Sequence, residues 1–231
     1  MAGTASGSRV ARRSFLSRLS AGLGVFGAAL AAHEAPAAAQ APGSTPWQPA
    51  RHPQDDWLES LPGKHRMVFD TTNRESFGSA LRFANNFFYA NQSGYGLTDA
   101  DTAVVIIARH DSTQFAMNDK MWAKYGGTLS RQDGAPDSTK KSVAARNVFN
   151  DRETAENGIT IDSLAQRGVH FAVCQMATRR LARMIATDTK NSGDGVYNDL
   201  AANIVQNAHL VPAGIVALNR AQERGYALAI G

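Results

Sequence analysis

The sequence predicts an α/β protein built on a mostly parallel sheet of about five strands with helices on both faces. Short apolar segments alternate with amphipathic ones along the last two thirds of the chain, which is the order expected of strand–helix units. The segment "DTAVVIIARH" (101–110) is a nearly continuous β-branched run, typical of a strand that is covered on both faces. Together these patterns favour a parallel sheet buried between two helical layers.

Each element follows from its own pattern, and no internal repeat is present. Phe77, Leu81, Ala84 and Phe88 recur at helical spacing, which indicates an amphipathic helix. Pro212 stands where proline is favoured, at the first position of a helix. The predicted strands are 65–70, 101–110, 169–174, 207–211 and 226–230. The predicted helices are 74–92, 113–126 (ended by Gly126-Gly127), 160–168, 176–188, 194–206 and 212–225.

The first 41 residues have the layout of an export signal. Residues 9–18 are rich in arginine, residues 19–32 are small and apolar, and Ala39-Gln40-Ala41 offers a cleavage site. The run Arg12-Arg13-Ser14-Phe15-Leu16 resembles a twin-arginine (Tat) motif. We expect cleavage after Ala41 and a periplasmic location. Because 14 apolar residues are too few to cross a bilayer, we also expect no membrane span in the mature form. The alternative is an uncleaved amphipathic anchor, for which the segment lacks a charged stripe.

The remainder divides into an entry segment and one domain. Residues 42–63 have no period and predict an irregular entry segment; residues 64–231 suit a single domain with a polar insertion at 128–158. The leader holds four arginines and one glutamate, so it carries +3 of the formal net charge of +4. The mature chain is therefore nearly neutral, which argues against nucleic-acid binding.

Cys174 is the sole cysteine, so no disulfide can form within the chain. It ends the predicted strand 169–174 and precedes a helix, whose positive amino-terminal end favours a thiolate. Arg179 and Arg180 add positive charge one to two turns further along. His110 and Asp111 end a neighbouring strand, and His209 lies in another. Since ligands bind beyond the carboxyl ends of parallel strands, we expect Cys174 and His110 as catalytic residues and Asp111, His209 and Arg179 as binding residues.

Other interpretations of these residues stay open. A free cysteine is often a buried apolar filler, and each histidine, His170 included, can be structural. A metal site of His110, Cys174 and His209 lacks any local metal-binding signature. We find no phosphate-binding loop, CxxC pair or HExxH motif, and expect no cofactor.

Several segments together resemble the DsrE/DsrF-like family of YchN-type fold. They are "GVHFAVCQMATRRLA" (168–182), "AHLVPAGIVALNRAQERGYALAIG" (208–231) and "AVVIIARHDSTQF" (103–115). The resemblance implies a three-layer α/β/α domain that forms trimers or hexamers. It also implies that Cys174 matches the cysteine on which some members carry a persulfide in sulfur relay or sulfur oxidation. The best-known members are cytoplasmic, unlike a chain with a Tat-like leader.

The resulting hypothesis is an exported sulfur-handling protein in which Cys174 carries a persulfide to a partner protein. The alternative is a non-catalytic oligomeric protein that binds a small ligand or acts as a scaffold, with Cys174 inert.

Overall fold

The structure is a computed structural model that describes residues 47–132, 144–153 and 155–231. The predicted leader (1–41) lies outside the described residues, as does 133–143 of the polar insertion. Five parallel strands form one sheet in the order β4-β3-β2-β1-β5. Their bounds are β1 (His65–Thr71), β2 (Thr102–Ala108), β3 (Val169–Cys174), β4 (Ala208–Val211) and β5 (Ala227–Ile230). The predicted fold class is confirmed.

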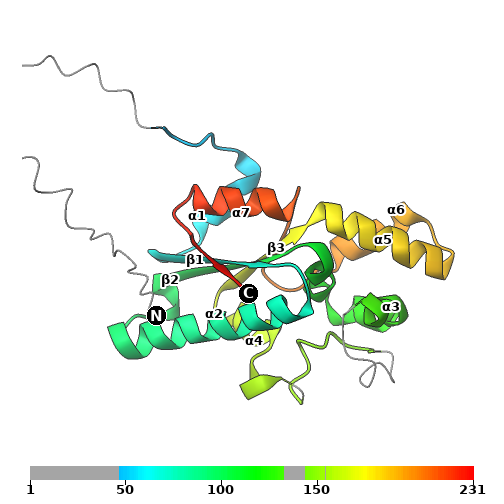
Figure 1. Cartoon of the computed structure of the whole chain (residues 1–231), viewed down its shortest axis with the longest axis horizontal. Helices are drawn as coiled ribbons and strands as arrows, with labels where there is room; N and C mark the ends of the chain where they lie inside the picture. The colour runs from blue at the N-terminus through cyan, green and yellow to red at the C-terminus, as the bar shows by residue number, and fades with distance from the viewer. Residues whose placement is uncertain (1–46, 133–143, 154) are drawn as a thin grey trace, which may run out of the picture. The chain divides into compact units, whose positions relative to one another are not determined.

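The two faces of the sheet are covered by different parts of the chain. One face packs against the helices between successive strands from β1 to β4, namely α2 (Arg74–Tyr95), α3 (Asp119–Gln132), α4 (Ile161–Gln166), α5 (Gln175–Thr189) and α6 (Gly193–Ala202). The other face packs against α1 (Trp57–Ser60) and α7 (Gly214–Gln222). Figure 1 shows α1 and α7 on one side of the sheet and α2 and α4 on the other. We call the face covered by α2 to α6 the first face and the face covered by α1 and α7 the second face.

Side-chain alternation assigns strand residues to these faces. Val104 and Ile106 of β2 point into the first-face core, whereas Val105 and Ile107 point into the second-face core. All seven residues of β2 are buried, as its β-branched run predicts for a central strand.

The second predicted helix is wrong in its bounds. The chain forms a 3₁₀ helix, η3 (His110–Ala116), and α3 begins only at Asp119. The preceding residue, Asn118, accepts hydrogen bonds from the amide of Met121 through its side-chain and backbone oxygens. Asn118 is thus a helix start that the pattern of apolar residues concealed. Residues assigned to α3 continue past Gly126-Gly127, but the backbone of Tyr125 is not helical (φ −121°, ψ 15°), so a kink directly before the two glycines divides the helix.

Helix α7 starts two residues later than predicted. Ala213 is its N-cap, so Pro212 lies outside the helix instead of at its first position. Gly214 takes the first position because a Cβ there would lie 2.5 Å from the Cβ of Arg109. This close approach brings the start of α7 onto the carboxyl end of β2.

The segment predicted as irregular contains a 3₁₀ turn, η1 (Pro53–Asp55), and the short helix α1. Leu58 and Leu61 are buried in the second-face core, and Trp57 packs against it. Within the described residues, no helix is long and apolar enough to cross a membrane.

Candidate active site at the carboxyl ends of the strands

Three polar side chains form a row across the carboxyl ends of adjacent strands. Asp70 lies in β1, Arg109 follows β2 and Cys174 ends β3. Arg109 and Cys174 directly follow the paired residues Ala108 and Val173, whereas Asp70 pairs with Ile107, two positions before Arg109. All three share the parity of the second-face residues Val68, Ile107 and Ala172. The row therefore faces the layer that contains α7.

Asp70 fixes Arg109. Its two carboxylate oxygens accept hydrogen bonds from Nε and Nη2 of Arg109, both at 2.7 Å. This bidentate pair raises the pKa of Arg109, and the charge of a Cys174 thiolate contributes in the same direction. Arg109 is thus a cation held within electrostatic reach of Cys174.

Cys174 is the N-cap of α5. Its Sγ accepts a hydrogen bond from the amide of Ala177 at 3.4 Å, and its carbonyl accepts one from the hydroxyl of Thr178. The residue is 6% exposed. The thiol therefore has the predicted strand-to-helix position, and a reagent must enter a nearly closed site to reach it.

His110 lies at a different place from this row. It has a left-handed backbone (φ 57°) and a side chain that is 63% exposed, and its Nδ1 is 3.2 Å from Oδ2 of Asp111. Asp111 also pairs with Arg180 of α5. These three residues rim a small hollow of about 10 Å³, room for about one water molecule, that Ala177 and Gln114 also line. Cys174 does not line this hollow. Ala177 does, and its amide is also the hydrogen-bond donor to Cys174, so Ala177 connects the hollow with the row.

His209 belongs to a third environment, under the entry segment. Its Nε2 is 2.9 Å from Nδ1 of His170, and its ring stacks on Trp57 at a centroid distance of 3.9 Å. Burial lowers the pKa of His209 to about 4, with a smaller contribution from the charge of His170. The pair is therefore neutral near pH 7.

Arg179, by contrast, extends away from the row, with its guanidinium 3.9 Å from the ring centre of Tyr197 in α6. The structure thus brings none of His110, Asp111, His209 or Arg179 into hydrogen-bond contact with Cys174 among the described residues.

The sequence interpretation missed Asp70, Arg109 and Gly214. A signal existed for the first two, because opposite charges follow the apolar parts of two successive predicted strands, "MVFD" and "IIAR". Gly214 lies in the segment 208–231 that carries the family resemblance, but no local pattern indicated its close approach to Arg109, a contact between distant elements.

A metal site is not assembled from these residues. In the described ranges no group of three or more His, Cys, Asp or Glu side chains could hold a metal ion. Comparisons with protein-family models, with curated proteins and with solved structures return no match.

Proposed function

We propose that this chain is an exported sulfur-handling protein in which Cys174 carries a sulfane sulfur as a persulfide. Two features around Cys174 carry the proposal. Its Sγ accepts a hydrogen bond from the amide of Ala177 at the start of α5, and Arg109, which Asp70 holds in place, lies within electrostatic reach. Both features place positive charge or an N–H donor beside Sγ, where a cysteine nucleophile carries its negative charge. The likeness of the Cys174 segment to DsrE/DsrF-like proteins suggests sulfur as the cargo.

The proposed step is a sulfur transfer without net oxidation. The Cys174 thiolate attacks the terminal sulfur of a donor persulfide, R–S–SH. A new S–S bond forms to Cys174, the donor S–S bond breaks, and R–S⁻ leaves while the proton stays on the transferred sulfur. The acceptor thiolate of a partner protein then repeats the attack on Cys174–S–SH and regenerates the Cys174 thiolate.

Incubation of the purified protein with a small persulfide donor, followed by mass spectrometry, tests this step. We expect a mass increase of one sulfur atom on Cys174, which a thiol reductant reverses and Cys174→Ser abolishes. Arg109→Gln should slow the loading about tenfold, whereas Arg179→Gln, a matched arginine outside the row, should not. An unmodified Cys174 would contradict the proposal.

His110 stays a predicted proton partner, because it rims the hollow that Ala177 also lines. His110→Ala tests it: a loading rate that falls and loses part of its pH dependence supports the role, and an unchanged rate argues against it.

The specific observation that favours the non-catalytic alternative is the low exposure of Cys174, at 6%. A thiol-specific reagent distinguishes the two. Under the proposal the native thiol reacts within minutes; an inert cysteine reacts only after denaturation.

Export and assembly are part of the same proposal. Arg12-Arg13→Lys-Lys should retain the precursor in the cytoplasm, and the mature chain should begin at Pro42. The family likeness suggests a trimer or hexamer, for which the native mass in solution is the measurement.

A further inference from the structure

Among the residues that the structure describes, no strand pairs with the outer edge of β5, and this edge is apolar. Three of its four residues are exposed, including Leu228 at 42% and Ile230 at 76%, and none carries a charge. At the opposite edge of the sheet, the residues of β4 are buried or half-buried. Natural edge strands are normally protected by charges, proline or bulges, and β5 has none of these.

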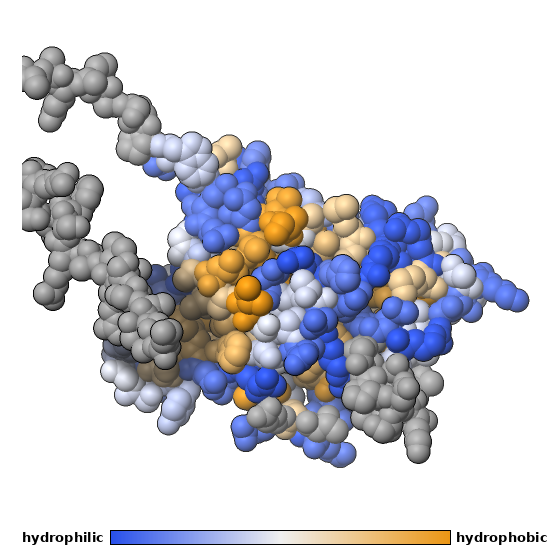
Figure 2. Space-filling model, in the orientation of Figure 1, coloured by the Kyte–Doolittle hydropathy of each residue, from blue (hydrophilic) through white to orange (hydrophobic). Residues whose placement is uncertain are grey.

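The apolar surface continues from β5 onto the neighbouring elements. Leu228 and Ile230 lie on the second face, where α7 adds Ile215 (58% exposed) and Val216 (38%). Figure 2 shows hydrophobic side chains gathered over α7 and the end of the chain. On the first face, Phe83 of α2 is also exposed. We call Ile215, Val216, Leu228, Ile230 and Phe83 the β5 patch.

The backbone of β5 offers a defined set of unused groups. The amide of Gly231 donates to Asp70 of β1, so residues of that parity point their N–H and C=O groups toward β1. Leu228 and Ile230 have the opposite parity and point theirs outward. In an antiparallel partner strand, the residue opposite Leu228 would point its own N–H and C=O groups toward β5, so the two residues could form a hydrogen-bonded pair.

We propose that the occupant of this edge is a second copy of the chain, joined by antiparallel pairing of β5 with β5 around a two-fold axis at Ala229. Leu228 then faces Ile230 of the other copy, and the two exchange N–H···O bonds in both symmetric positions. Ala229 faces Ala229 in the closely spaced, non-hydrogen-bonded position, where its small side chain permits approach. The result is a continuous ten-stranded sheet.

Self-pairing fits this edge better than a foreign strand would. A two-fold axis normal to the sheet keeps each face on its own side, so Ile215 and Val216 extend the same interface in both copies. Because both copies carry the same charges, a self-association surface must avoid like-charge contacts, and none of the four residues of β5 is charged. A hexamer of dihedral symmetry contains two-fold interfaces, whereas a trimer does not.

Cross-linking tests the register directly. Ala229→Cys should form an intermolecular disulfide under mild oxidation, because directly opposed strand positions lie within the Cα spacing of a disulfide. Leu228→Cys, which faces Ile230 instead, is the matched control and should cross-link at least about tenfold less. Equal cross-linking by both, or by neither, would overturn the register.

Native mass measurement by light scattering tests the interface, with circular dichroism to verify folding. Leu228→Lys and Ile230→Glu should each raise the dissociation constant of the two-fold contact at least about tenfold, and the double variant should recover part of it because the introduced charges face each other. Ile230→Pro removes one outward amide without touching the bonds to β1, and should also weaken the contact. A protein that is monomeric throughout the micromolar range, or an assembly indifferent to all these changes, would refute the proposal.

Discussion

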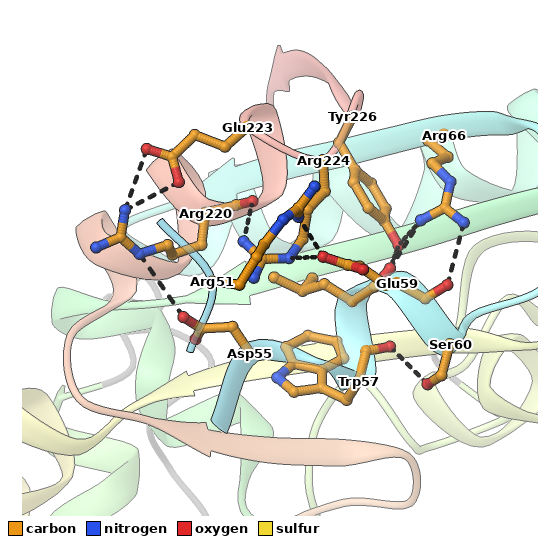
Figure 3. Close-up of polar contacts among 11 residues, drawn as sticks. Arg51, Asp55, Trp57, Glu59, Ser60, Arg66, Arg220, Glu223, Arg224 and Tyr226 are labelled. Atoms are coloured by element: carbon orange, nitrogen blue, oxygen red, sulfur yellow. Dashed lines mark hydrogen bonds and ion pairs between the residues drawn. The ribbon is translucent and has the colours of Figure 1, made fainter. Parts of the chain in front are cut away.

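The two faces of the sheet are stabilised in different ways. The first-face core joins five helices through large side chains, among them a cluster of aromatic rings from Phe77, Phe115, Phe149 and Phe171. The second-face core is smaller and consists of α1, α7 and the strand residues beneath them. Polar contacts reinforce it: Arg66 and Tyr226, which are labelled in Figure 3, both donate to the carbonyl of Leu58 at 2.7 Å.

Charged pairs add to this attachment. Arg224 contacts Glu59 at 3.1 Å and Arg220 contacts Asp55 at 3.6 Å, so residues of the α7 region reach down to η1 and α1 (Figure 3). The entry segment precedes β1 and is held to the sheet by these contacts and by Leu58 and Leu61. We infer that the second face opens more easily than the first. Since Asp70, Arg109 and Cys174 face this layer, the part of the fold that opens most easily is the part that covers the candidate site.

The largest effect is expected at the centre of the first face. Phe77→Ala should lower the free energy of unfolding by about 3–5 kcal/mol, because the fully buried ring contacts three other aromatic rings. Urea denaturation followed by tryptophan fluorescence measures it. Phe77→Leu, which keeps much of the volume, should cost less; equal losses for both variants would argue against a packing cause.

A matched pair of leucines compares the faces directly. Leu58 in α1 and Leu81 in α2 are both almost fully buried. Leu81→Ala should cost about 2–5 kcal/mol of global stability. Leu58→Ala should lower global stability by less, because the entry segment detaches before the rest of the domain unfolds. The loss then cannot exceed the free energy that attaches this segment to the sheet.

Limited proteolysis separates these two modes of loss. In Leu58→Ala we expect cleavage between Arg51 and Arg66 while far-ultraviolet circular dichroism is unchanged. In Leu81→Ala cleavage should follow the loss of the signal. Identical proteolytic patterns would show that the two faces unfold together.

The pH dependence of stability should come in part from the second face. The pKa of His209 is about 4 in the folded chain and near 6.5 when unfolded, so between these values the unfolded chain binds a proton that the folded chain excludes. Stability therefore falls as the pH decreases from 6.5 to 4 and is level above that window. After allowance for the partial exposure of the ring, we expect a loss of about 1–2 kcal/mol.

The matching experiment compares unfolding curves of wild type and His209→Gln at pH 7 and pH 4.5. The difference between the two pH values should be smaller in the variant. An equal difference in both proteins would remove His209 as the cause.

The sequence predicted the elements better than the site, for physical reasons. Strands such as β2 are specified by local β-branched runs, and α2 by the spacing of its apolar residues, so both could be predicted. Cys174 was placed correctly because a strand-to-helix junction is also a local feature. Three contacts could not be predicted because their partners lie 39 to 152 positions apart in the chain. They are the ion pair of Arg109 with Asp70, the stacking of Trp57 on His209 and the contact of Gly214 with Arg109. Such pairs become visible only when the strand order is known.

The smallest effect is expected from a single hydroxyl on each face. The Tyr226 hydroxyl donates to Leu58 on the second face, and burial raises its pKa to about 12, so it remains a donor at all neutral pH values. The Tyr125 hydroxyl donates to Asp199, between α3 and α6. Tyr226→Phe and Tyr125→Phe should each cost about 0.5–1.5 kcal/mol, the usual range for one hydrogen bond. Hydrogen exchange should distinguish them: Tyr226→Phe should accelerate exchange in residues 57–61, whereas Tyr125→Phe should leave that segment as protected as in wild type. Accelerated exchange there in both variants would mean that the second face is coupled to the first and does not open by itself.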